Sequence, residues 1–322
     1  MTTAIERLAR ALGGRARAEH PLGELTTYRV GGRAALFVEA SDETDLEVVR
    51  GVLADEDPPV PLLVLGKGSN LLVADRGFLG LAVRLGPGLS GIELPPVPAD
   101  GEPAVVRAGG GAGLPVLARR TADAGLRGLE WAVGVPGSVG GAVRMNAGGH
   151  GSDTAGCLVR YRWVDLASPA GGVDLPERLA LGYRTSAVAP SEVVVWAELA
   201  VTAGDPGAAR AAVADIVRWR RANQPGGSNA GSVFANPPGD AAGRLVEAAG
   251  LKGHRLGTAR VSEKHANFIQ ADDGGSADDV RRLMDHVAAT VEARLGVRLR
   301  PEVRLVGFDD GDEHEGSCRW AR

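Results

Sequence analysis

The stretch GVPGSVGGAVRMNAGGHG, residues 134–151, is unusually rich in glycine for a segment that also carries bulky apolar side chains. Glycines at 134, 137 and 140 recur every third residue, and Gly141 follows directly. Backbone without Cβ atoms lets another surface approach closely. A mobile surface loop would not need the valines and methionine that stand between these glycines, at positions 135, 139, 143 and 145. We therefore expect a packed loop that faces a ring system or a pyrophosphate.

The first glycine-rich stretch along the chain is VLGKGSNLLV, residues 64–73, whose glycines directly follow the apolar run 61–65. Ligands often bind where such a strand ends. Gly66 and Gly68 allow backbone N–H groups to converge on phosphate oxygens, and Ser69 and Asn70 add side-chain donors. A tight turn between two buried strands is the alternative for this loop alone. Two such loops in one chain favour a large cofactor that carries phosphate.

Residues 104–114, AVVRAGGGAGL, loosely imitate the dinucleotide-binding fingerprint of strand, glycines and helix, and Glu130 follows about 20 residues later. If Gly109 and Gly111 begin the G-x-G-x-x-G pattern, its third glycine falls at position 114, where Leu114 stands. The sequence therefore gives poor support to a nicotinamide-binding Rossmann domain.

Length and composition narrow the class of protein. At 322 residues with 44% apolar residues, the chain can form two or three compact units. A formal net charge of −4 gives no electrostatic reason to expect nucleic acid as a partner. Cys157 and Cys318 lie far apart, and the histidines lack metal-ligand spacing. We expect a reducing compartment, no disulfide framework and no metal site.

The N-terminal stretch MTTAIERLARALGG reads as a short amphipathic helix ended by Gly13 and Gly14, not as a signal peptide. No apolar run approaches the roughly 18 residues of a membrane span. The sequence thus predicts a soluble, cytoplasmic protein without a membrane partner.

Strands and helices are expected in mixed order. The predicted strands are 35–40, 61–65, 81–85, 104–108, 157–166 and 193–201. One predicted helix follows Ser41 as its N-cap, and another begins at Pro206 after the N-cap Asp205. The others cover 114–124, 242–249 and 277–295. Ser276 and Asp279 resemble a capping box at the start of the last helix. The tail 309–322 lacks apolar periodicity, and we expect it to be frayed.

The two glycine-rich stretches belong to a longer ordered set of motifs. The others are PLGELTTYRVGG (21–32), LGYRTS (181–186), AGSVFANP (230–237), AGLKGHRLGTARVSEKHANFI (249–269) and RPEVRLVGF (300–308). Together they resemble the UDP-N-acetylenolpyruvoylglucosamine reductase family, which makes UDP-N-acetylmuramate for peptidoglycan. The resemblance runs from about Pro21 to Phe308, and the specificity lies in the whole set.

This resemblance implies an α+β protein with a vanillyl-alcohol-oxidase/PCMH-type FAD-binding fold. After an N-terminal helix (1–20), the implied FAD-binding subdomains are 21–94 and 95–204, and the proline-rich loop 95–100 marks their boundary. An α+β substrate-binding domain (205–308) would precede the tail. The spacing between Tyr183 and Ser232 indicates the subgroup without an extra tyrosine-bearing lid. We expect a monomer.

The implied cofactor is FAD, reduced by NADPH as the hydride donor. The resemblance assigns it a set of contacts: Gly66, Lys67, Gly68, Ser69, Asn70, Leu71, Gly134, Pro136, Gly137, Ser138, Gly140, Gly141 and Arg304, the last beside the flavin ring. Tyr183, Asn236, Lys264 and His265 are the implied contacts of the substrate, UDP-N-acetylglucosamine enolpyruvate.

In the implied reaction, the reduced flavin gives hydride to the vinyl CH₂ of the enolpyruvyl ether, and C2 then needs a proton. Ser232 would donate that proton, while Arg184 and Glu302 polarise the substrate carboxylate. A guanidinium suits this task because it binds a carboxylate through two parallel hydrogen bonds. A second anion would repel the enolate, so we hypothesise that Glu302 is protonated in the productive complex, with its pKa raised by the substrate carboxylate.

Each of these residues also fits an ordinary structural role when taken alone: Ser232 as a turn residue, Arg184 and Glu302 as solvated surface groups. The chain departs from common family patterns at Ala235, where lysine is frequent, and at Gly149 and His150, where alanine and tyrosine are frequent. Two alternatives remain open. One is another FAD-dependent oxidoreductase of this fold, such as a sugar-lactone or alcohol oxidase, and the other is a non-catalytic binding relative.

Overall fold

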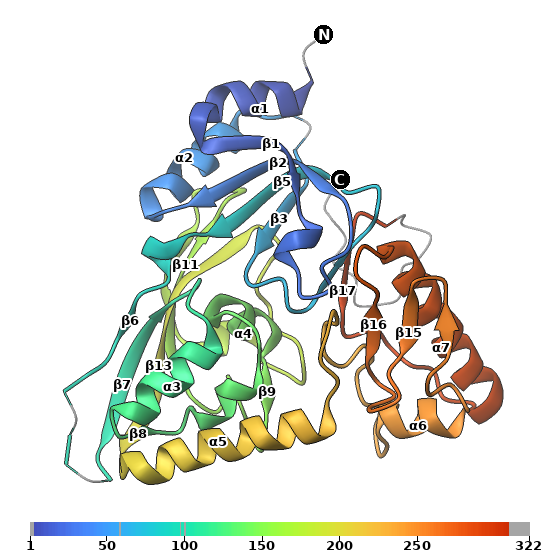
Figure 1. The fold of residues 1–322 in the computed structure, drawn as a ribbon. Helices are drawn as coiled ribbons and strands as arrows, with labels where there is room; N and C mark the ends of the chain where they lie inside the picture. The colour runs from blue at the N-terminus through green and yellow to red at the C-terminus, as the bar shows by residue number, and fades with distance from the viewer. Residues whose placement is uncertain (1–2, 58, 97, 100, 309–322) are drawn as a thin grey trace.

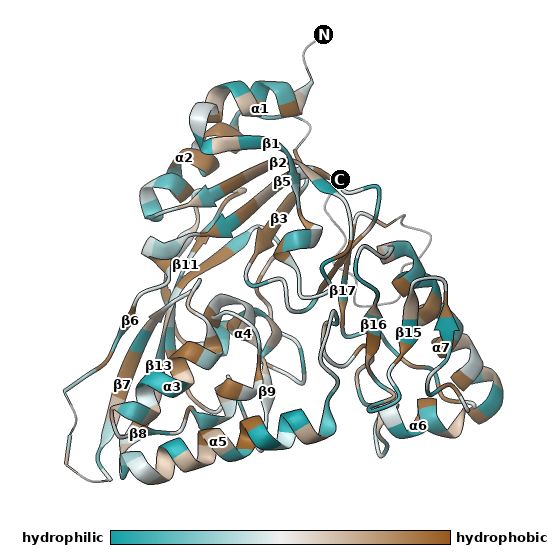
Figure 2. Cartoon of the chain, in the orientation of Figure 1, coloured by the Kyte–Doolittle hydropathy of each residue, from teal (hydrophilic) through white to brown (hydrophobic). Residues whose placement is uncertain are grey.

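The computed structural model describes residues 3–308 except 58, 97 and 100 (Figure 1). Its first unit is a four-stranded sheet in the order β1 (Ala16–Pro21), β2 (Arg33–Ala40), β5 (Phe78–Leu85) and β3 (Leu62–Leu65). β2, β5 and β3 run parallel, and β1 is antiparallel. The apolar residues along these strands colour the ribbon brown in Figure 2. They form the buried layers that hold the sheet against its helices.

Two helices cover this sheet, α1 (Ala4–Leu12) and α2 (Glu43–Ala54). Thr3 and Glu6 form a reciprocal capping box on α1, and Gly13 ends the helix as predicted. The predicted cap of α2 was wrong by one residue. Asp42, not Ser41, accepts the hydrogen bond from the backbone N–H of Asp45, because its carboxylate reaches one turn into the helix.

The second unit is a six-stranded antiparallel sheet. It contains β12 (Gly171–Asp174), β11 (Leu158–Asp165), β13 (Glu192–Ala203), β7 (Pro103–Gly109) and β6 (Ile92–Glu93) in that order, with β8 (Leu126–Arg127) paired to β13. Its helices are α3 (Leu114–Asp123), α4 (Val139–Met145) and α5 (Pro206–Asn223). Asp205 caps α5 as predicted.

Helix α5 packs with the second unit. Ala209 and Val213 are buried in the same cluster as α3 and the second sheet. Figure 1 shows α5 lying along α3 and the short element η4 (Glu130–Gly134). Residues 206–223 thus share the core of the second unit, and the domain boundary before them, which the resemblance implies, stays a prediction.

The glycine-rich stretch 134–151 is more regular than the expected loop. Its middle forms α4, capped by Ser138, whose hydroxyl accepts a hydrogen bond from the N–H of Gly141. Asn146 ends the helix in the left-handed conformation. β9 (Gly148–Gly149) and β10 (Ser152–Asp153) then form a small hairpin. The valines at 139 and 143 are buried, which is the reason that the stretch packs as a helix.

The third unit combines α6 (Ala242–Ala248) and α7 (Ala277–Leu295) with a three-stranded antiparallel sheet. The strands are β14 (Arg255–Leu256), β15 (Ala259–Val261) and β16 (Ile269–Ala271). Only half of the predicted capping box on α7 is present. Ser276 accepts from the N–H of Asp279, but the Asp279 carboxylate accepts hydrogen bonds from Thr258 instead of reaching back.

The end of the described chain returns to the first unit. β17 (Arg304–Val306) pairs in parallel with β4 (Leu71–Val73), at the end of the first glycine-rich stretch. Asp75 adds a second connection, because its carboxylate accepts hydrogen bonds from Ser276, Ala277 and Asp278 at the start of α7. These contacts fix the third unit against the first. No helix within the described residues is long and apolar enough to cross a membrane. The predicted tail, 309–322, lies outside the described residues.

Candidate active site

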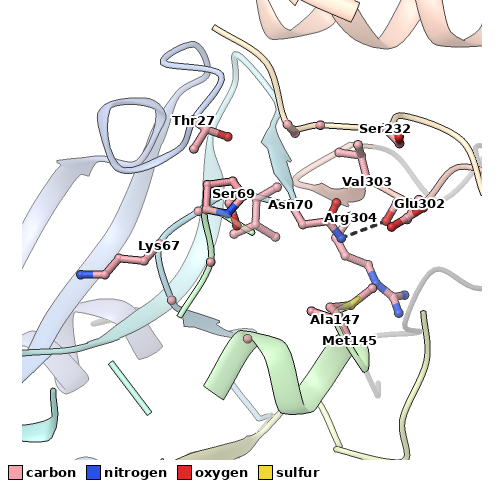
Figure 3. A pocket seen from close by; sticks show the side chains of 18 of the residues that line it. Thr27, Lys67, Ser69, Asn70, Met145, Ala147, Ser232, Glu302, Val303 and Arg304 are labelled. Carbon is pink, nitrogen blue, oxygen red and sulfur yellow. Dashed lines mark hydrogen bonds between the residues drawn. The ribbon is translucent and has the colours of Figure 1, made fainter. Parts of the chain in front are cut away.

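A cavity of about 1070 Å³ lies where the three units meet. Figure 3 shows part of its wall, with the first glycine-rich stretch on one side and Ser232 and Glu302 on the other. Most of the site residues predicted from the sequence line it: Gly66, Lys67, Gly68, Ser69, Asn70, Leu71, Gly134, Pro136, Gly137, Ser138, Gly141, Tyr183, Arg184, Ser232, Asn236, Glu302 and Arg304. Segments far apart in the sequence thus meet at one cavity.

The two glycine-rich stretches contact each other in the cavity wall. A Cβ atom on Gly66 would lie 2.4 Å from the Oγ of Ser138, and one on Gly137 would lie 3.4 Å from the Oγ of Ser69. The absence of a side chain at Gly66 therefore lets the loops meet, whereas Gly137 has room for a Cβ at ordinary contact distance. The result is a continuous surface of backbone and hydroxyl groups with few bulky side chains, formed by residues 66–71 and 134–141. We call it the glycine wall.

Gly68 is required for its own conformation. Its φ is +62°, and a Cβ there would lie 2.2 Å from the carbonyl oxygen of Leu25. The Gly68 carbonyl in turn accepts a hydrogen bond of 3.1 Å from the N–H of Thr27. The first glycine-rich stretch is thereby fixed to the TTYRVGG segment.

The Thr27 hydroxyl is buried, lines the cavity and has no protein hydrogen-bond partner. A buried hydroxyl without a partner is costly, so a ligand that accepts or donates a hydrogen bond would satisfy it. This unpartnered hydroxyl and the glycine wall fit a bound phosphate-bearing cofactor such as FAD. Among the described residues, no group of three or more possible metal ligands gathers.

Gly140 differs from the other predicted cofactor contacts. It does not line the cavity, and its N–H donates to the carbonyl of Gly110 at 2.8 Å. A Cβ on Gly140 would lie 3.2 Å from that carbonyl oxygen and 3.3 Å from the carbonyl oxygen of Val194. This glycine packs α4 against the second sheet.

Arg184 and Glu302 form an ion pair at the other side of the cavity, with Nε and Oε1 2.9 Å apart. A second guanidinium nitrogen of Arg184 donates to the carbonyl of Gly148 at 2.9 Å. The backbone of Arg184 has a φ of +57°, which is strained for a residue with a side chain. Such strain persists only where surrounding contacts hold it, and it gathers at functional sites.

Glu302 is partly buried, with 16% of its side chain exposed. Burial raises the pKa of Glu302 above its ordinary value, while the charge of Arg184 and its hydrogen bond oppose this effect. The raised direction agrees with the hypothesis that Glu302 is protonated in the productive complex. Burial already supplies a cause for it before any substrate carboxylate is considered.

Ser232 is brought toward Glu302 by backbone pairing. Phe234 forms an antiparallel bridge with Pro301, and the N–H of Glu302 donates to the carbonyl of Val233 at 2.8 Å. Asn70 completes this arrangement by donating to the carbonyl of Glu302 at 3.0 Å, the dashed line in Figure 3. The segment with Ser232, the segment with Glu302 and the first glycine-rich stretch are therefore connected.

Phe234 anchors the segment that carries Ser232. Its side chain is 2% exposed and packs in the core of the third unit. Asn267 supports this position, because its side chain accepts from the N–H of Phe234 at 3.0 Å and donates to the Phe234 carbonyl at 2.8 Å. A large aromatic residue in a short turn thus fixes the neighbouring serine.

Arg304 follows Glu302 by two residues, and its backbone N–H donates to the carbonyl of Asn70 at 3.0 Å. Figure 3 places its side chain near Met145 and Ala147, at the end of α4. Tyr183 lines the cavity beside Arg184 and is 61% exposed. Asn236 also lines the cavity, and its Oδ1 accepts from the N–H of Ala242 at the start of α6.

Lys264 and His265 are not brought to the cavity. The Nζ of Lys264 donates to the carbonyl of Arg221 at 2.5 Å, and the His265 ring packs against Phe268 with centroids 4.8 Å apart. Neither residue is among those that line the cavity. Their role in substrate binding remains a prediction from the resemblance.

The polar residues that line the cavity and that the sequence reasoning did not single out include Thr27, Arg144 and Arg220. Thr27 belongs to the motif PLGELTTYRVGG (21–32), so the sequence could have indicated it as a site residue. Arg144 and Arg220 lie near the C-terminal ends of α4 and α5, where basic residues are common for helix-dipole reasons alone. Only the three-dimensional arrangement separates them from ordinary surface arginines.

A cavity with a phosphate-compatible glycine wall and a cluster of Arg, Ser and Glu side chains defines the class of a cofactor-dependent enzyme. Family comparisons agree. Residues 34–171 match the FAD binding domain family, and residues 223–306 match the family described as UDP-N-acetylenolpyruvoylglucosamine reductase, C-terminal domain.

Whole-chain relatives specify the family. The chain is 43% identical over 295 residues to the UDP-N-acetylenolpyruvoylglucosamine reductase of Rubrobacter xylanophilus, covering 91% of this chain and 95% of that protein. It is 42% identical over 310 residues to that of Thiobacillus denitrificans, with 93% and 94% covered. The crystal structure of the Thermus caldophilus enzyme superposes with a TM-score of 0.74 at 35% identity, covering 90% of this chain and 99% of that one. This chain belongs to the UDP-N-acetylenolpyruvoylglucosamine reductase family, which confirms the resemblance and the predicted fold class.

Proposed function

We propose that this protein is an FAD-dependent oxidoreductase that uses NADPH to reduce UDP-N-acetylglucosamine enolpyruvate to UDP-N-acetylmuramate, a step in peptidoglycan precursor synthesis. The observation that carries the proposal is the convergence of Arg184, Ser232 and Glu302 on one cavity. These residues come from three separate segments, and an ion pair and a backbone bridge hold them together.

The glycine wall is the proposed site of FAD. The stretches 66–71 and 134–141 would line its phosphates with backbone and with the hydroxyls of Ser69 and Ser138, while the N–H groups of Gly140 and Gly141 already donate within the protein. Arg304 would lie beside the flavin ring. The unpartnered Thr27 hydroxyl is a further candidate contact. Bound FAD supplies hydride transfer, from NADPH and to the vinyl carbon of the substrate.

Arg184 is proposed to bind the substrate carboxylate. In the described structure its guanidinium contacts Glu302, so an incoming carboxylate would compete for the same cation. Arg184 now opposes the rise of the Glu302 pKa, and this effect would weaken once the substrate engages the guanidinium. Glu302 would then take up a proton and act as a hydrogen-bond donor to the substrate carboxylate.

Ser232 is proposed to donate the proton that C2 of the substrate receives. A serine hydroxyl is a weak acid, but an enolate is a strong base, so geometry counts for more than a matched pKa. The buried anchor Phe234 and the bridge to Pro301 give Ser232 the required fixed position. Tyr183 and Asn236 line the same cavity and are proposed contacts of the nucleotide sugar.

The proposal needs one chain, since a single chain supplies every cavity residue named above, and we propose a monomer. Both proposed substrates, a nucleotide sugar and NADPH, belong to the cytoplasmic pool, which is where the proposal places the protein.

An anaerobic two-step experiment tests the function. NADPH should bleach the yellow absorbance of the holoprotein, and enolpyruvyl-UDP-N-acetylglucosamine should then restore it. Absence of recovery with this substrate would refute the proposal. Fast recovery with oxygen alone would favour an oxidase of the same fold, and failure of NADPH to bleach would favour a non-catalytic relative.

A further inference from the structure

Arg184 lies at the tip of a loop, residues 179–188, that we call the Arg184 loop. Its two stems meet where the N–H of Ala187 donates to the carbonyl of Leu179 at 2.7 Å. Nearer the tip, Gly182 and Thr185 exchange backbone hydrogen bonds of 3.1 and 3.3 Å. The position of the Arg184 side chain therefore depends on what holds these stems.

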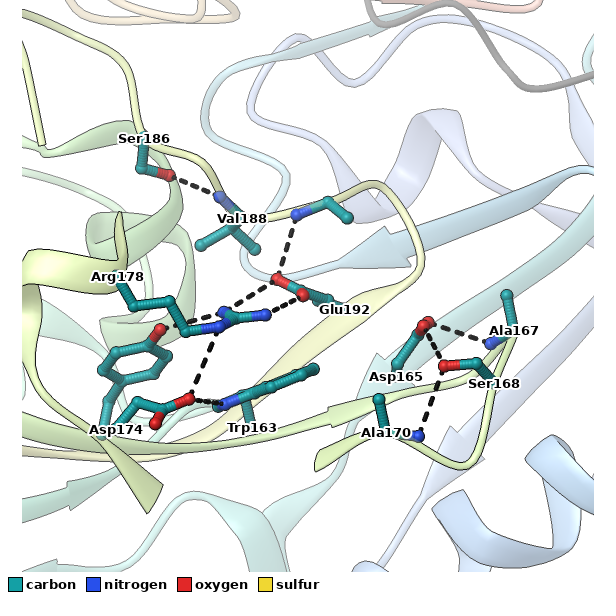
Figure 4. Close-up of polar contacts among 12 residues, drawn as sticks. Trp163, Asp165, Ala167, Ser168, Ala170, Asp174, Arg178, Ser186, Val188 and Glu192 are labelled. Carbon is teal, nitrogen blue, oxygen red and sulfur yellow. Dashed lines mark hydrogen bonds and ion pairs between the residues drawn. The ribbon is translucent and has the colours of Figure 1, made fainter. Parts of the chain in front are cut away.

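Glu192, at the start of β13, contacts the chain on both sides of the Arg184 loop (Figure 4). Its Oε1 accepts from the guanidinium of Arg178, before the loop, at 2.5 Å. Its Oε2 accepts from the N–H of Ala189, after the loop, at 3.0 Å. Glu192 is only 7% exposed, and its carboxylate thus joins the two stems of the loop.

Arg178 is itself fixed on several sides. It belongs to the short element η5 (Pro176–Leu179), and its guanidinium carbon lies 3.6 Å from the ring centroid of Trp163. It donates to the hydroxyl of Tyr161 at 3.0 Å and forms an ion pair with Asp174 at 3.4 Å. A guanidinium with this many partners has little freedom to move, so it can transmit a fixed position to the loop.

None of these five residues, which are Tyr161, Trp163, Asp174, Arg178 and Glu192, lines the cavity. They cannot touch a ligand there, but they support the loop that presents Arg184. The strained backbone of Arg184, with a φ of +57°, makes such support necessary, because an unsupported residue would relax to an ordinary conformation.

We propose that the Arg178–Glu192 ion pair is a positioning device for Arg184: it closes the base of the Arg184 loop and holds the guanidinium where the substrate carboxylate binds. This inference rests on the proposed function. Arg178 and Glu192 act through Arg184 and take no part in the chemistry themselves.

The same sheet offers a matched control. Glu198, also on β13 and 8% exposed, pairs with Arg160 on β11 at 2.5 Å and with Arg107 on β7 at 2.6 Å. This cluster joins strands of the sheet and contacts no part of the Arg184 loop. Replacing Arg160 removes an arginine from a β13 glutamate without disturbing the loop.

The experiment compares Arg178→Met with Arg160→Met in the holoprotein, with both half-reactions followed anaerobically by flavin absorbance. For Arg178→Met we expect flavin content and bleaching by NADPH close to wild type. Recovery of the absorbance with saturating enolpyruvyl-UDP-N-acetylglucosamine should be slower by about 10- to 100-fold, since small misplacements of a catalytic group have effects of this size. Arg160→Met should leave both half-reactions unchanged.

Two further variants keep the test decisive if Arg178→Met does not fold. Arg178→Lys retains the charge but loses the forked contacts, and Glu192→Gln retains the shape but loses the charge. Both should fall between wild type and the expected Arg178→Met rate in the recovery step. Wild-type recovery rates in these variants would overturn the inference, as would an equal loss in Arg160→Met or an equal slowing of bleaching by NADPH. A wild-type protein that does not recover with this substrate would instead refute the proposed function.

Discussion

The two sides of the cavity are built in different ways. The glycine wall consists of backbone from two contiguous stretches, and its shape depends on side chains that are missing, as at Gly66 and Gly68. The opposite side consists of the side chains of Arg184, Ser232 and Glu302, which come from distant segments. Under the proposed function, the first side holds the cofactor and the second supplies the groups that act on the substrate.

This difference predicts different failures. A change in the glycine wall should disturb FAD binding and therefore both half-reactions. A change on the opposite side should spare bleaching by NADPH and slow only the recovery with the enolpyruvyl substrate.

Ser232→Ala should have the largest effect. Loss of a positioned proton donor slows such steps by about 10²- to 10⁴-fold, so the recovery step should fall by this amount. Bleaching by NADPH should stay near wild type, because the hydroxyl is not part of the glycine wall. Stopped-flow absorbance measures the rates of both steps. Wild-type rates in both would show that Ser232 is a turn residue and not a proton donor.

Arg184→Met should slow recovery by about 10²- to 10³-fold, the usual range when one group that stabilises developing charge is removed. The variant also leaves the partly buried Glu302 without its cation. Thermal unfolding should therefore be followed in parallel. A recovery rate within a few-fold of wild type would show that Arg184 does not bind the substrate carboxylate.

Gly68→Ala should impair both half-reactions through loss of FAD. The new Cβ would meet the carbonyl of Leu25, and the positive φ alone costs about 1 kcal/mol or more for a residue with a side chain. Gly274→Ala is the matched control, because Gly274 has a φ of +67° and open space around its Cβ position. Flavin content per chain after purification compares the two, and equal retention would argue against the glycine wall as the FAD site.

Glu302→Gln should change the pH dependence of recovery more than its maximal rate. Because the reactive form is proposed to be protonated and burial raises the pKa of Glu302, the wild-type rate should be highest at low pH. It should decline as pH rises through that pKa, whereas glutamine cannot ionise and should give a flatter profile. Identical profiles for the two proteins from about pH 5 to about pH 8 would contradict protonation of Glu302.

Lys264→Ala should have the smallest effect. Its Nζ is bound to the carbonyl of Arg221 and lies outside the cavity wall, so KM for the enolpyruvyl substrate should change by less than about threefold. A much larger increase in KM would support the contact with substrate phosphate that the resemblance implies.

The contrast between the two sides also explains what the sequence could predict. A backbone wall is encoded by contiguous glycine patterns, so most of its residues were identifiable. The sequence could not show that Gly140 packs against Gly110 while the neighbouring glycines face the cavity. Both situations require a residue without a side chain. The helical middle of residues 134–151 was missed for a similar reason, since glycine content favours loops while buried Val139 and Val143 favour packing.

Side chains that converge from distant segments carry no local signal. Arg184, Ser232 and Glu302 were named through the resemblance, whereas their ion pair and backbone bridge appear only in three dimensions. The packing of α5 against α3 could not be predicted either. The amphipathic pattern of α5 shows that one face is buried, but it does not identify the element that this face packs against.

The parallel pairing of β17 with β4 has a consequence for how the protein is made. The partner strand of β4 is β17, which pairs residues 304–306 with residues 71–73. β4 therefore stays unpaired until nearly the whole described chain has been synthesised. Contacts between such distant residues form slowly, because a long chain segment must first be closed into a loop. A ribosome-bound chain that stops before Arg304 would display the first glycine-rich stretch beside an unpaired strand edge. Firm retention of flavin would then be the signal that synthesis has passed the last strand.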